Sequence, residues 1–399
     1  MNKYNNLNIA YLGLSEKLSS RHAGAIHVGE IVKGFKKFKN KVHLYCEENN
    51  KHYNYVHYVK LPIGFKEILL LNIIKAFKSL KEILRDFEHY KPDIIYERWH
   101  HPDIFSYIIA RKTKVPRMLE VNSPITEEIH SYPILSIISK LFRKIQFDQS
   151  SAIITQTKTL AKLLRTMTNT PVYIVPNGVS TDMFTDKLEF PLIYNNIPNI
   201  DKKIKVTFVG SFKQWHGVEQ IPLIAKKIIE KHNNVIFILV GSGELLSNVL
   251  NIIPNHLKKD IILTGAQPYE EIPKYLANSD ILIAPFNAAN YKAFKKYHFW
   301  WCPIKLYEYM SSGKPIVSYD YLEVKEIIGN HNLLAKIGNK NDFIDKLDSL
   351  INNKSLRIKI GKQNRLIAIK EYTWSKRVKQ TLKVIHSVLN KEKHLIYND

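Results

Sequence analysis

The most informative stretch of the chain is residues 303–317, where a loop, a short helix and an apolar strand are predicted to follow one another. Lys305 and Glu308 lie three residues apart, so both fall on the polar side of that helix. The free N–H groups and the dipole at a helix N-terminus favour an anion such as a phosphate. A carboxylate one turn further along can accept hydrogen bonds from both hydroxyls of a ribose. The spacing therefore indicates half of a site for a nucleoside diphosphate.

A second segment, residues 206–218, is expected to supply the other half of this site. It is predicted to be a buried strand that ends at Gly210, followed by a basic loop and by Gly217 at the start of a helix. Glycine at position 210 lets the backbone approach an anion closely, and Lys213 and His216 add hydrogen-bond donors. We do not expect His216 to bind a metal, because no second ligand lies at helical spacing.

Polar residues also follow two consecutive predicted strands in the first half of the chain. Arg98 and His100 lie in residues 96–101, and Glu120 and Asn122 lie in residues 119–124. Ligand sites of α/β proteins form at such strand ends. Asn122 cannot act as a base, but its amide can hydrogen-bond a hydroxyl of a ligand. Glu127, next to Glu128, either contacts a ligand or simply stabilises the start of a helix.

Alternating apolar and amphipathic segments predict two parallel α/β sheets wrapped by helices. The strands expected in the first half are 9–12, 42–46, 55–61, 93–96, 117–121, 152–155 and 172–175, with helices at 25–38, 66–89, 103–112, 135–147 and 157–166. The second half is expected to have strands at 205–209, 235–240, 261–264, 281–284 and 315–318, with helices at 218–231, 245–253, 269–276, 305–310, 324–328, 340–351, 354–371 and 375–391. The predicted domains are residues 1–190 and 204–374, joined by a linker at 191–203.

Composition narrows the class of protein. A hydrophobic content of 45% excludes a disordered chain, and the length suits two domains of ordinary size. Cys46 and Cys302 form no disulfide framework and suggest a reducing compartment. The chain shows neither a signal-peptide pattern nor an apolar run long enough for a membrane span. The expected location is therefore cytoplasmic, with possible peripheral contact with the inner face of the membrane.

The formal net charge of +23 raises the question of a polyanionic partner. The basic excess is spread over both halves, and no zinc finger, basic zipper or aromatic–basic RNA motif is present, so we expect no nucleic acid partner. Two interpretations remain open for the helix expected around 73–87. Its basic face, with Lys75, Lys78, Lys81 and Arg85, is either solvated or rests on anionic lipid, while Ile73, Phe77, Leu80, Leu84 and Phe87 form the opposite, core-facing side.

Together with Val-Pro-Asn-Gly-Val-Ser-Thr-Asp-Met-Phe at 175–184, residues 206–218 and 303–317 resemble the retaining glycosyltransferases of family 4. The resemblance covers nearly the whole chain, and it is strongest in 204–330 and weakest before residue 90. It implies the GT-B fold, in which two Rossmann-like, doubly wound domains face each other across a cleft. The last helix, from residue 375, would cross back to the first domain. Tyr-Thr-Trp-Ser at 372–375 looks like the corner where that crossing begins.

The resemblance also implies an activity. A sugar, from the hexosyl or N-acetylhexosaminyl class, would move from a UDP- or GDP-linked donor to a hydroxyl of a glycan or lipid-linked acceptor. The stereochemistry would be retained, and the pathway would be the assembly of a glycan, lipopolysaccharide, capsule or glycolipid. No cofactor is expected, and no metal either, since the chain has no Asp-x-Asp sequence.

The donor-binding residues implied by the resemblance are Gly24, Gly210, Ser211, Lys213, His216, Ala266, Gln267, Pro303, Ile304, Lys305 and Glu308. Ala266 and Gln267 would meet the nucleobase through their backbone, and Gly24 would lie in a flexible loop near the diphosphate. The residues expected to act in catalysis are Asn122, Lys213 and Lys305. Arg98, His100, Glu120 and Glu127 are expected on the acceptor side.

The chain departs from the family pattern at several of these positions. Trp300 stands where relatives have a glutamate that holds the sugar, eight residues before Glu308. Ser211 and His216 stand where Arg and Lys are common, so Lys213 and Lys305 would replace the lost charge. Asn122 and Ser123 occupy the place of a His-Asp pair. Two other functions stay open: a sugar-nucleotide epimerase of the same fold, and a non-enzymatic basic scaffold that binds polyanions in a salt-sensitive way.

Overall fold

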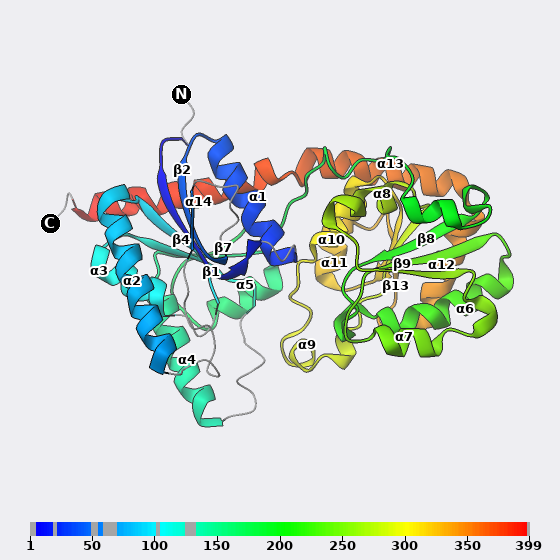
Figure 1. The fold of residues 1–399 in the computed structure, drawn as a ribbon, viewed down its shortest axis with the longest axis horizontal. Helices are drawn as coiled ribbons and strands as arrows, with labels where there is room; N and C mark the ends of the chain where they lie inside the picture. Colours follow the sequence, from blue (N-terminus) through cyan, green and yellow to red (C-terminus); the bar gives the residue numbers. More distant parts are fainter. Residues whose placement is uncertain are drawn as a thin grey trace. The chain divides into compact units, whose positions relative to one another are not determined.

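The computed structural model describes residues 5–18, 22–48, 55–58, 70–100, 104–123 and 133–396. The chain forms two compact units. Unit 1 comprises residues 1–176 and 374–399, and unit 2 comprises residues 177–373. Figure 1 shows a sheet flanked by helices in each unit. Glu127, one of the residues predicted on the acceptor side, lies outside the described residues.

Unit 1 is built on a parallel sheet with the strand order β3-β2-β1-β4-β5-β6-β7. Its strands are β1 (Asn8–Lys17), β2 (Lys41–Glu48), β3 (Val56–Tyr58), β4 (Ile94–Arg98), β5 (Arg117–Glu120), β6 (Ala152–Thr155) and β7 (Val172–Ile174). Its helices are α1 (Ala23–Lys37), α2 (Leu70–Tyr90), α3 (Phe105–Thr113), α4 (Pro133–Asp148), α5 (Lys158–Arg165) and α14 (Trp374–Ile396).

The two faces of this sheet are buried under different helices. Ile9 and Tyr11 of β1 belong to a core that includes residues of α1 and α14, whereas Ala10 and Leu12 belong to a core that includes residues of α2 and α3. Successive side chains of a strand point to opposite faces, so a strand covered on both faces must be apolar throughout. Gly34 of α1 leaves room for Val378 of α14, because a Cβ at position 34 would collide with that valine.

Unit 2 repeats the plan with the parallel order β10-β9-β8-β11-β12-β13. Its strands are β8 (Ile204–Val209), β9 (Val235–Val240), β10 (Ile261–Gly265), β11 (Ile281–Ala284), β12 (Ile316–Tyr319) and β13 (Leu333–Ala335). Its α-helices are α6 (Ile221–Lys231), α7 (Leu246–Ile252), α8 (Ile272–Ala277), α9 (Lys292–Tyr297), α10 (Ile304–Ser311), α11 (Leu322–Ile328), α12 (Lys340–Asn352) and α13 (Lys354–Glu371).

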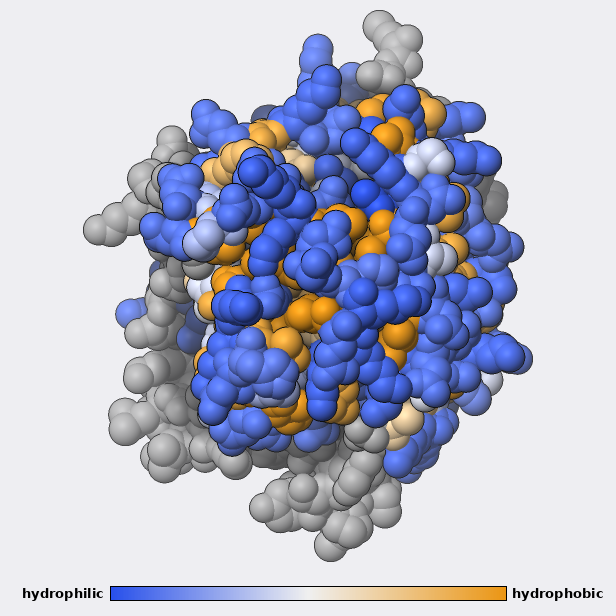
Figure 2. Space-filling model, turned by 90° about the vertical axis from the view of Figure 1, so that its right-hand side faces the viewer, coloured by the Kyte–Doolittle hydropathy of each residue, from blue (hydrophilic) through white to orange (hydrophobic). Residues whose placement is uncertain are grey.

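Short 3₁₀ helices complete unit 2: η4 (Leu192–Asn196), η5 (Ile200–Lys202), η6 (Gln214–His216), η7 (Val218–Gln220), η8 (Asn255–Leu257), η9 (Tyr269–Glu271) and η10 (Ala288–Asn290). Figure 2 shows the surface at the right of Figure 1, where hydrophilic residues surround small groups of apolar ones. Within the described part of the chain, no helix combines the length and the apolar character that a membrane crossing requires.

The boundary between the units falls at Pro176, earlier than the predicted residue 190. The reason is a set of contacts that hold 177–190 to unit 2. Asn177 donates to the carbonyl of Cys302 over 2.7 Å, and Arg365 donates to the carbonyl of Phe184 over 2.7 Å. The stretch expected as a linker, 191–203, is not free chain either, because Tyr194 is buried and its ring packs against Tyr275. The last helix begins at Trp374, one residue before the predicted start.

Candidate functional site

The candidate site of unit 2 lies where the strand order reverses direction. β8 has β9 on one side and β11 on the other, so the connections leave the carboxyl ends of β8 and β11 in opposite directions. Crevices at such a switch point are the usual ligand sites of open α/β sheets. β8 ends at Val209 and is followed by the loop 210–217, and β11 ends at Ala284.

Tyr309 fixes α10 to this switch point. Its buried hydroxyl accepts a hydrogen bond from the N–H of Val209 over 2.8 Å and lies 3.5 Å from the carbonyl oxygen of Ile283. One side chain therefore ties the helix that carries Lys305 and Glu308 to the ends of β8 and β11. This role is not evident from the sequence, where its visible signal is a tyrosine directly after the glutamate of the predicted helix.

Gly210 and Lys305 fit together closely. Gly210 has φ +151°, and a Cβ there would collide with the ammonium nitrogen of Lys305. That nitrogen is buried and has no hydrogen-bond partner among the described residues. It lies 4.5 Å from the ring centroid of Phe208. Burial lowers the pKa of Lys305 to about 7, against the opposing effect of the Glu308 carboxylate. A buried cation without a partner is costly, so this arrangement favours an incoming anion.

Glu308 is 6% exposed, and its Oε1 accepts a hydrogen bond from the hydroxyl of Tyr269 over 2.8 Å. Burial raises the pKa of Glu308 to about 7, although Tyr269 and Lys305 act in the opposite direction. Tyr269 follows β10, so this bond brings the segment with Ala266 and Gln267 close to α10. The bond from Tyr269 thus ties the chain that follows β10 to α10, while the base contact of Ala266 and Gln267 stays a prediction.

The structure changes the role predicted for His216. Its Nδ1 contacts the carbonyl oxygen of Ser211, which can only accept, so Nδ1 carries the proton. Burial, and next the positive charge of Lys305, hold the pKa of His216 well below its usual range. The ring is therefore neutral, and its buried Nε2, which has no partner among the described residues, is an acceptor and not a donor. His216 suits a sugar hydroxyl better than a phosphate oxygen.

The loop 210–217 packs closely against neighbouring backbone at two points, and a glycine makes room at each of them. Gly217 has φ +68°, and a Cβ there would meet the carbonyl oxygen of Pro285. On the other side, a Cβ at Gly241 would meet the carbonyl oxygen of Gly210, and the N–H of Phe212 donates to Ser242 over 2.9 Å. The role of Gly-Ser-Gly at 241–243 was not predicted from the sequence. Its one signal is that these residues directly follow a predicted strand.

The other residues of unit 2 that were predicted to bind the sugar donor lie around Lys305, Glu308 and His216. Ser211 and Lys213 are exposed, and the Lys213 ammonium is 4.9 Å from the ring centroid of Trp215. Pro303 precedes the first residue of α10, Ile304, and no described side chain caps that helix N-terminus. The N–H of Leu306 donates to the carbonyl of Pro303 over 3.1 Å, so an anion there would meet the two N–H groups before it, those of Ile304 and Lys305.

Trp300, which stands in place of the family's first glutamate, lies in an aromatic cluster. It is buried, and its ring packs edge-on against Phe294 with centroids 4.7 Å apart. Its neighbour Trp301 stacks on His216 with centroids 5.2 Å apart. The wall beside His216 is thus aromatic rather than acidic, so a donor sugar would meet ring faces and a neutral imidazole.

Unit 1 contains a second polar group at the ends of β4 and β5. Glu120 is 1% exposed and accepts hydrogen bonds from His27 over 2.9 Å and from Arg98 over 2.8 Å. Burial opposes its ionisation, but His27 and Arg98 hold the pKa of Glu120 at about 2. The predicted acceptor contact of Glu120 is therefore corrected: the carboxylate lies too deep to touch an acceptor, and it positions Arg98. Arg98 also pairs with Glu16 over 2.7 Å.

Asn122 is held by the same group. Its amide nitrogen lies 3.2 Å from Glu120, and its oxygen accepts a hydrogen bond from Gln156. Gln156 and Glu16 were missed in the sequence, because nothing local sets them apart. Gly24 faces the carboxylate of Glu16, which a Cβ at that position would press against. His100, by contrast, is exposed.

The described residues contain no group of three or more His, Cys, Asp or Glu side chains arranged for a metal. The two cysteines, Cys46 and Cys302, are buried, and they form no disulfide.

Both halves of the chain match family models of glycosyltransferases. Residues 24–183 match the family model for Glycosyltransferase Family 4, and residues 193–367 match the model for Glycosyl transferases group 1. An uncharacterized glycosyltransferase of Methanocaldococcus jannaschii is 24% identical over 364 residues, which are 90% of this chain and 93% of that protein. A second one from the same organism is 29% identical over 58% of this chain and 62% of its own length.

Solved structures show the same fold. HepE of Anabaena in complex with UDP and glucose has a TM-score of 0.72 at 15% identity, over 96% of this chain and all of that one. Sucrose-phosphate synthase of Thermosynechococcus elongatus has a TM-score of 0.70 at 13% identity, over 97% and 100% of the two chains. WaaG, a glycosyltransferase involved in lipopolysaccharide biosynthesis, has a TM-score of 0.66 at 12% identity, over 94% and 99%.

Proposed function

Because the chain is a glycosyltransferase of the GT-B fold, we propose that it moves a sugar from a nucleoside-diphosphate sugar to an acceptor hydroxyl with retention of stereochemistry. The observation that carries this proposal is the ammonium of Lys305, which is buried under Gly210 with no hydrogen-bond partner among the described residues, one helical turn before the carboxylate of Glu308. The two charges are spaced for a diphosphate and its ribose.

The proposed mechanism places the departing diphosphate at the N-terminus of α10. Lys305 and Lys213, together with the uncapped N–H groups of α10, stabilise the negative charge that develops as the bond to the sugar breaks. Glu308 fixes the ribose, and the neutral His216 accepts a hydrogen bond from a sugar hydroxyl. In relatives, a glutamate at the position of Trp300 holds the donor sugar. We propose that His216 holds the sugar in this chain.

The backbone of Ala266 and Gln267 contacts the nucleobase of the donor in this proposal. The side-chain amide of Gln267 donates to the carbonyl of Thr264 over 2.8 Å, so it fixes the loop rather than reading the base. HepE, whose structure holds UDP, supports a uridine donor, and guanosine stays as the second candidate.

In unit 1, Asn122 is the proposed contact to the acceptor. Its amide is oriented by Glu120 and Gln156, so it meets a hydroxyl in a fixed direction. Arg98 and the exposed His100 are the further proposed acceptor contacts. A glycan or a lipid-linked sugar is the proposed acceptor, in the assembly of a polysaccharide or glycolipid.

A thermal-shift screen of UDP- and GDP-linked sugars tests the donor, because a ligand that binds only the folded state raises its melting temperature. The stabilising donor is then incubated with candidate acceptors, and the anomeric configuration of the product is read by NMR. A retained anomer supports the proposal, and an inverted one contradicts the stereochemistry. Conversion of the donor into an isomeric nucleotide sugar, with no transfer, would instead identify an epimerase.

A further inference from the structure

Two histidines at the edge of the sheet of unit 1 form a hydrogen-bonded chain with an aspartate. His43 lies on β2, and His57 lies on β3, the strand that ends the sheet on this side. Nδ1 of His43 is 3.4 Å from Nε2 of His57, and Nδ1 of His57 is 3.1 Å from the carboxylate of Asp86 on α2. Three side chains therefore connect β2, β3 and α2.

One arrangement of hydrogens satisfies this chain near neutral pH. The ionised carboxylate of Asp86 can only accept, so Nδ1 of His57 carries a hydrogen and donates to it. Nε2 of a neutral His57 is then an acceptor, so Nδ1 of His43 carries the hydrogen that lies between the two rings. Both imidazoles are therefore neutral in this arrangement.

Aromatic rings hold both imidazoles in place. His43 stacks on Tyr90 of α2 with centroids 3.7 Å apart, and His57 stacks on Tyr45 of β2 with centroids 4.6 Å apart. Tyr45 is buried in the core that contains Phe87 of α2. Each imidazole would lose a stacked neighbour if it turned away from the other, so the two rings stay close together when they titrate.

Helix α2 places Asp86 at the border between the core and the solvent. Leu80 and Phe87 are buried, as the sequence predicted, whereas Phe77 is 66% exposed, so its predicted place on the core-facing side was wrong. The basic residues of this helix that are exposed, as expected, are Lys78, Lys81 and Arg85. The side chain of Asp86 is 34% exposed, so it reaches His57 while part of it stays in contact with water.

Added protons change the bond between the two rings. A first proton makes His57 a cation, which donates to Asp86 and, at its other nitrogen, to the second tautomer of a neutral His43. A second proton, on His43, leaves both facing nitrogens as donors. The hydrogen bond is then lost, and two cations face each other across 3.4 Å beside a single carboxylate.

The surroundings of the pair resist both protons. The titratable groups of β2 and α2 that face the two rings are Tyr45, Tyr90, Asp86, Lys41 and His89. Burial, and next the neighbouring His57, lower the pKa of His43, while the carboxylate of Asp86 acts in the opposite direction. Burial also lowers the pKa of His57, again against the effect of Asp86.

The direction of the pH effect follows from these lowered pKa values. A histidine of the unfolded chain takes up a proton near pH 6.5, whereas the folded pair takes up its protons at lower pH. The stability that the neutral chain contributes is therefore complete above about pH 6.5 and is lost as the pH falls below it. The loss acts first on β3, because this strand has three residues and pairs on one side only.

We propose that His43, His57 and Asp86 form a pH-sensitive latch on β3. Near neutral pH the latch ties β3 to β2 and α2. In mild acid the doubly protonated pair repels, and β3 separates from β2 while the rest of the sheet stays paired. The N–H of Leu44, which donates to the carbonyl of Tyr55 over 3.0 Å in the closed state, then exchanges with water.

Hydrogen exchange of the full chain at pH 7.5 and pH 5.0 tests the latch. Protection factors are compared, because they remove the effect of pH on the intrinsic exchange rate. The amide of Leu44 is expected to lose at least tenfold in protection at pH 5.0, whereas β4 in the centre of the same sheet should keep its protection. NMR titration of His43 and His57 should show both rings protonating below pH 6.5.

Two variants should act in opposite directions. His43→Phe keeps a ring on Tyr90 but takes up no proton, so the amide of Leu44 should stay protected at pH 5.0. Asp86→Asn keeps an acceptor for His57 but removes the charge that compensates the first proton. Its Leu44 amide should therefore lose protection at a higher pH than in the parent.

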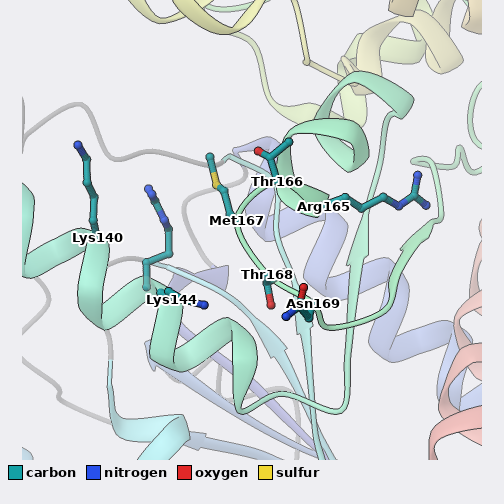
Figure 3. Close-up of a pocket in the computed structure, with 8 residues that line it drawn as sticks. Lys140, Lys144, Arg165, Thr166, Met167, Thr168 and Asn169 are labelled. Carbon is teal, nitrogen blue, oxygen red and sulfur yellow. The ribbon is translucent and has the colours of Figure 1, made fainter.

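The chain offers a matched control for each variant. Asp148→Asn removes a carboxylate whose side chain is 31% exposed, close to the 34% of Asp86, and which pairs with Lys144. Figure 3 shows Lys144 on α4, beside an open cavity of about 370 Å³. His256→Phe removes an exposed histidine of unit 2. Both controls should lose protection of the Leu44 amide at the same pH as the parent.

Several results would overturn the proposal. They are equal protection of Leu44 at both pH values in the parent, or the same loss in His43→Phe as in the parent. A parallel loss at β4 would show acid unfolding of the whole sheet instead of a latch. If His43→Phe does not fold, imidazoles of the parent that titrate at or above pH 6.5, or an Asp86→Asn variant that opens at the parental pH, would contradict the latch. None of these results depends on the proposed sugar transfer.

Discussion

Lys305 and Glu308 carry the proposed donor site, since the ammonium nitrogen of Lys305 and the side chain of Glu308 are buried and both pKa values are displaced toward neutrality. Ionisable groups with strongly shifted pKa values are typical of ligand and catalytic sites, so this pair points to a bound ligand. The sequence identified both residues from their spacing. It could not show that the Lys305 ammonium lies under Gly210, because that contact joins residues almost a hundred positions apart.

The first prediction is that Gly210→Ala weakens binding of a nucleoside diphosphate at least tenfold. The new methyl group would displace the Lys305 ammonium, and the backbone at φ +151° would be strained by about 1–3 kcal/mol. Isothermal titration calorimetry measures the affinity. Gly338→Ala is the control, because its φ of +76° is also strained but its Cβ would meet open space. Equal losses of affinity in both variants would exclude the specific contact.

The second prediction concerns pH. Lys305 must be protonated to hold a diphosphate, so affinity should fall as pH rises above its pKa of about 7. Glu308 must be ionised to accept ribose hydroxyls, so affinity should also fall as pH drops below its pKa of about 7. The affinity profile is expected to be a narrow bell with its maximum near neutrality. A flat profile across that range would mean that neither group titrates on binding.

At the scale of elements, α10 is positioned by Tyr309 at the point where β8 and β11 diverge. The strands and longer helices were predictable to within a few residues, because their apolar patterns run over several turns or alternations. α9 and β13 were not predicted, since six and three residues are too few to show a period. The position of the switch point between β8 and β11 depends on the order of the strands in the sheet. Local sequence patterns do not determine that order.

The third prediction is that Tyr309→Phe destabilises unit 2 and weakens donor binding together. The substitution leaves the buried N–H of Val209 without its acceptor, which costs about 1–3 kcal/mol. Tyr319→Phe serves as the control, because its hydroxyl donates to the side chain of Gln220 over 3.0 Å and touches no strand end. Thermal unfolding and titration of the two variants give the comparison. A Tyr309→Phe protein with parental stability and affinity would show that this hydroxyl does not hold α10.

At the scale of the whole molecule, the net charge of +23 is distributed over both units and is not concentrated in an arm. Its general consequence is attraction to anionic substrates and surfaces.

The boundary between the units was predicted fourteen residues too late, because 177–190 has an irregular sequence whose attachment depends on partners such as Arg365. In the polar group of unit 1, Arg98, Glu120 and Asn122 were foreseen, but their burial and their pairing were not.

The fourth prediction is that chelation of divalent metals leaves most of the transfer activity intact. The diphosphate would be neutralised by Lys213, Lys305 and the N-terminus of α10. Initial rates with and without a chelator, after dialysis, provide the measurement. Complete loss of activity that magnesium or manganese restores would overturn this arrangement of the leaving group.

The central claim is that Glu308 holds the ribose of the donor, and a ligand-by-residue cycle tests it most directly. The parent and Glu308→Ala are each titrated with a ribonucleoside diphosphate and with its 2′-deoxy form. We predict that the parent binds the ribose form at least tenfold more tightly, because the lost charged hydrogen bond is worth roughly 1.5–3 kcal/mol, and that Glu308→Ala binds both forms equally weakly. An equal preference for ribose in the parent and in a folded Glu308→Ala variant would contradict the account.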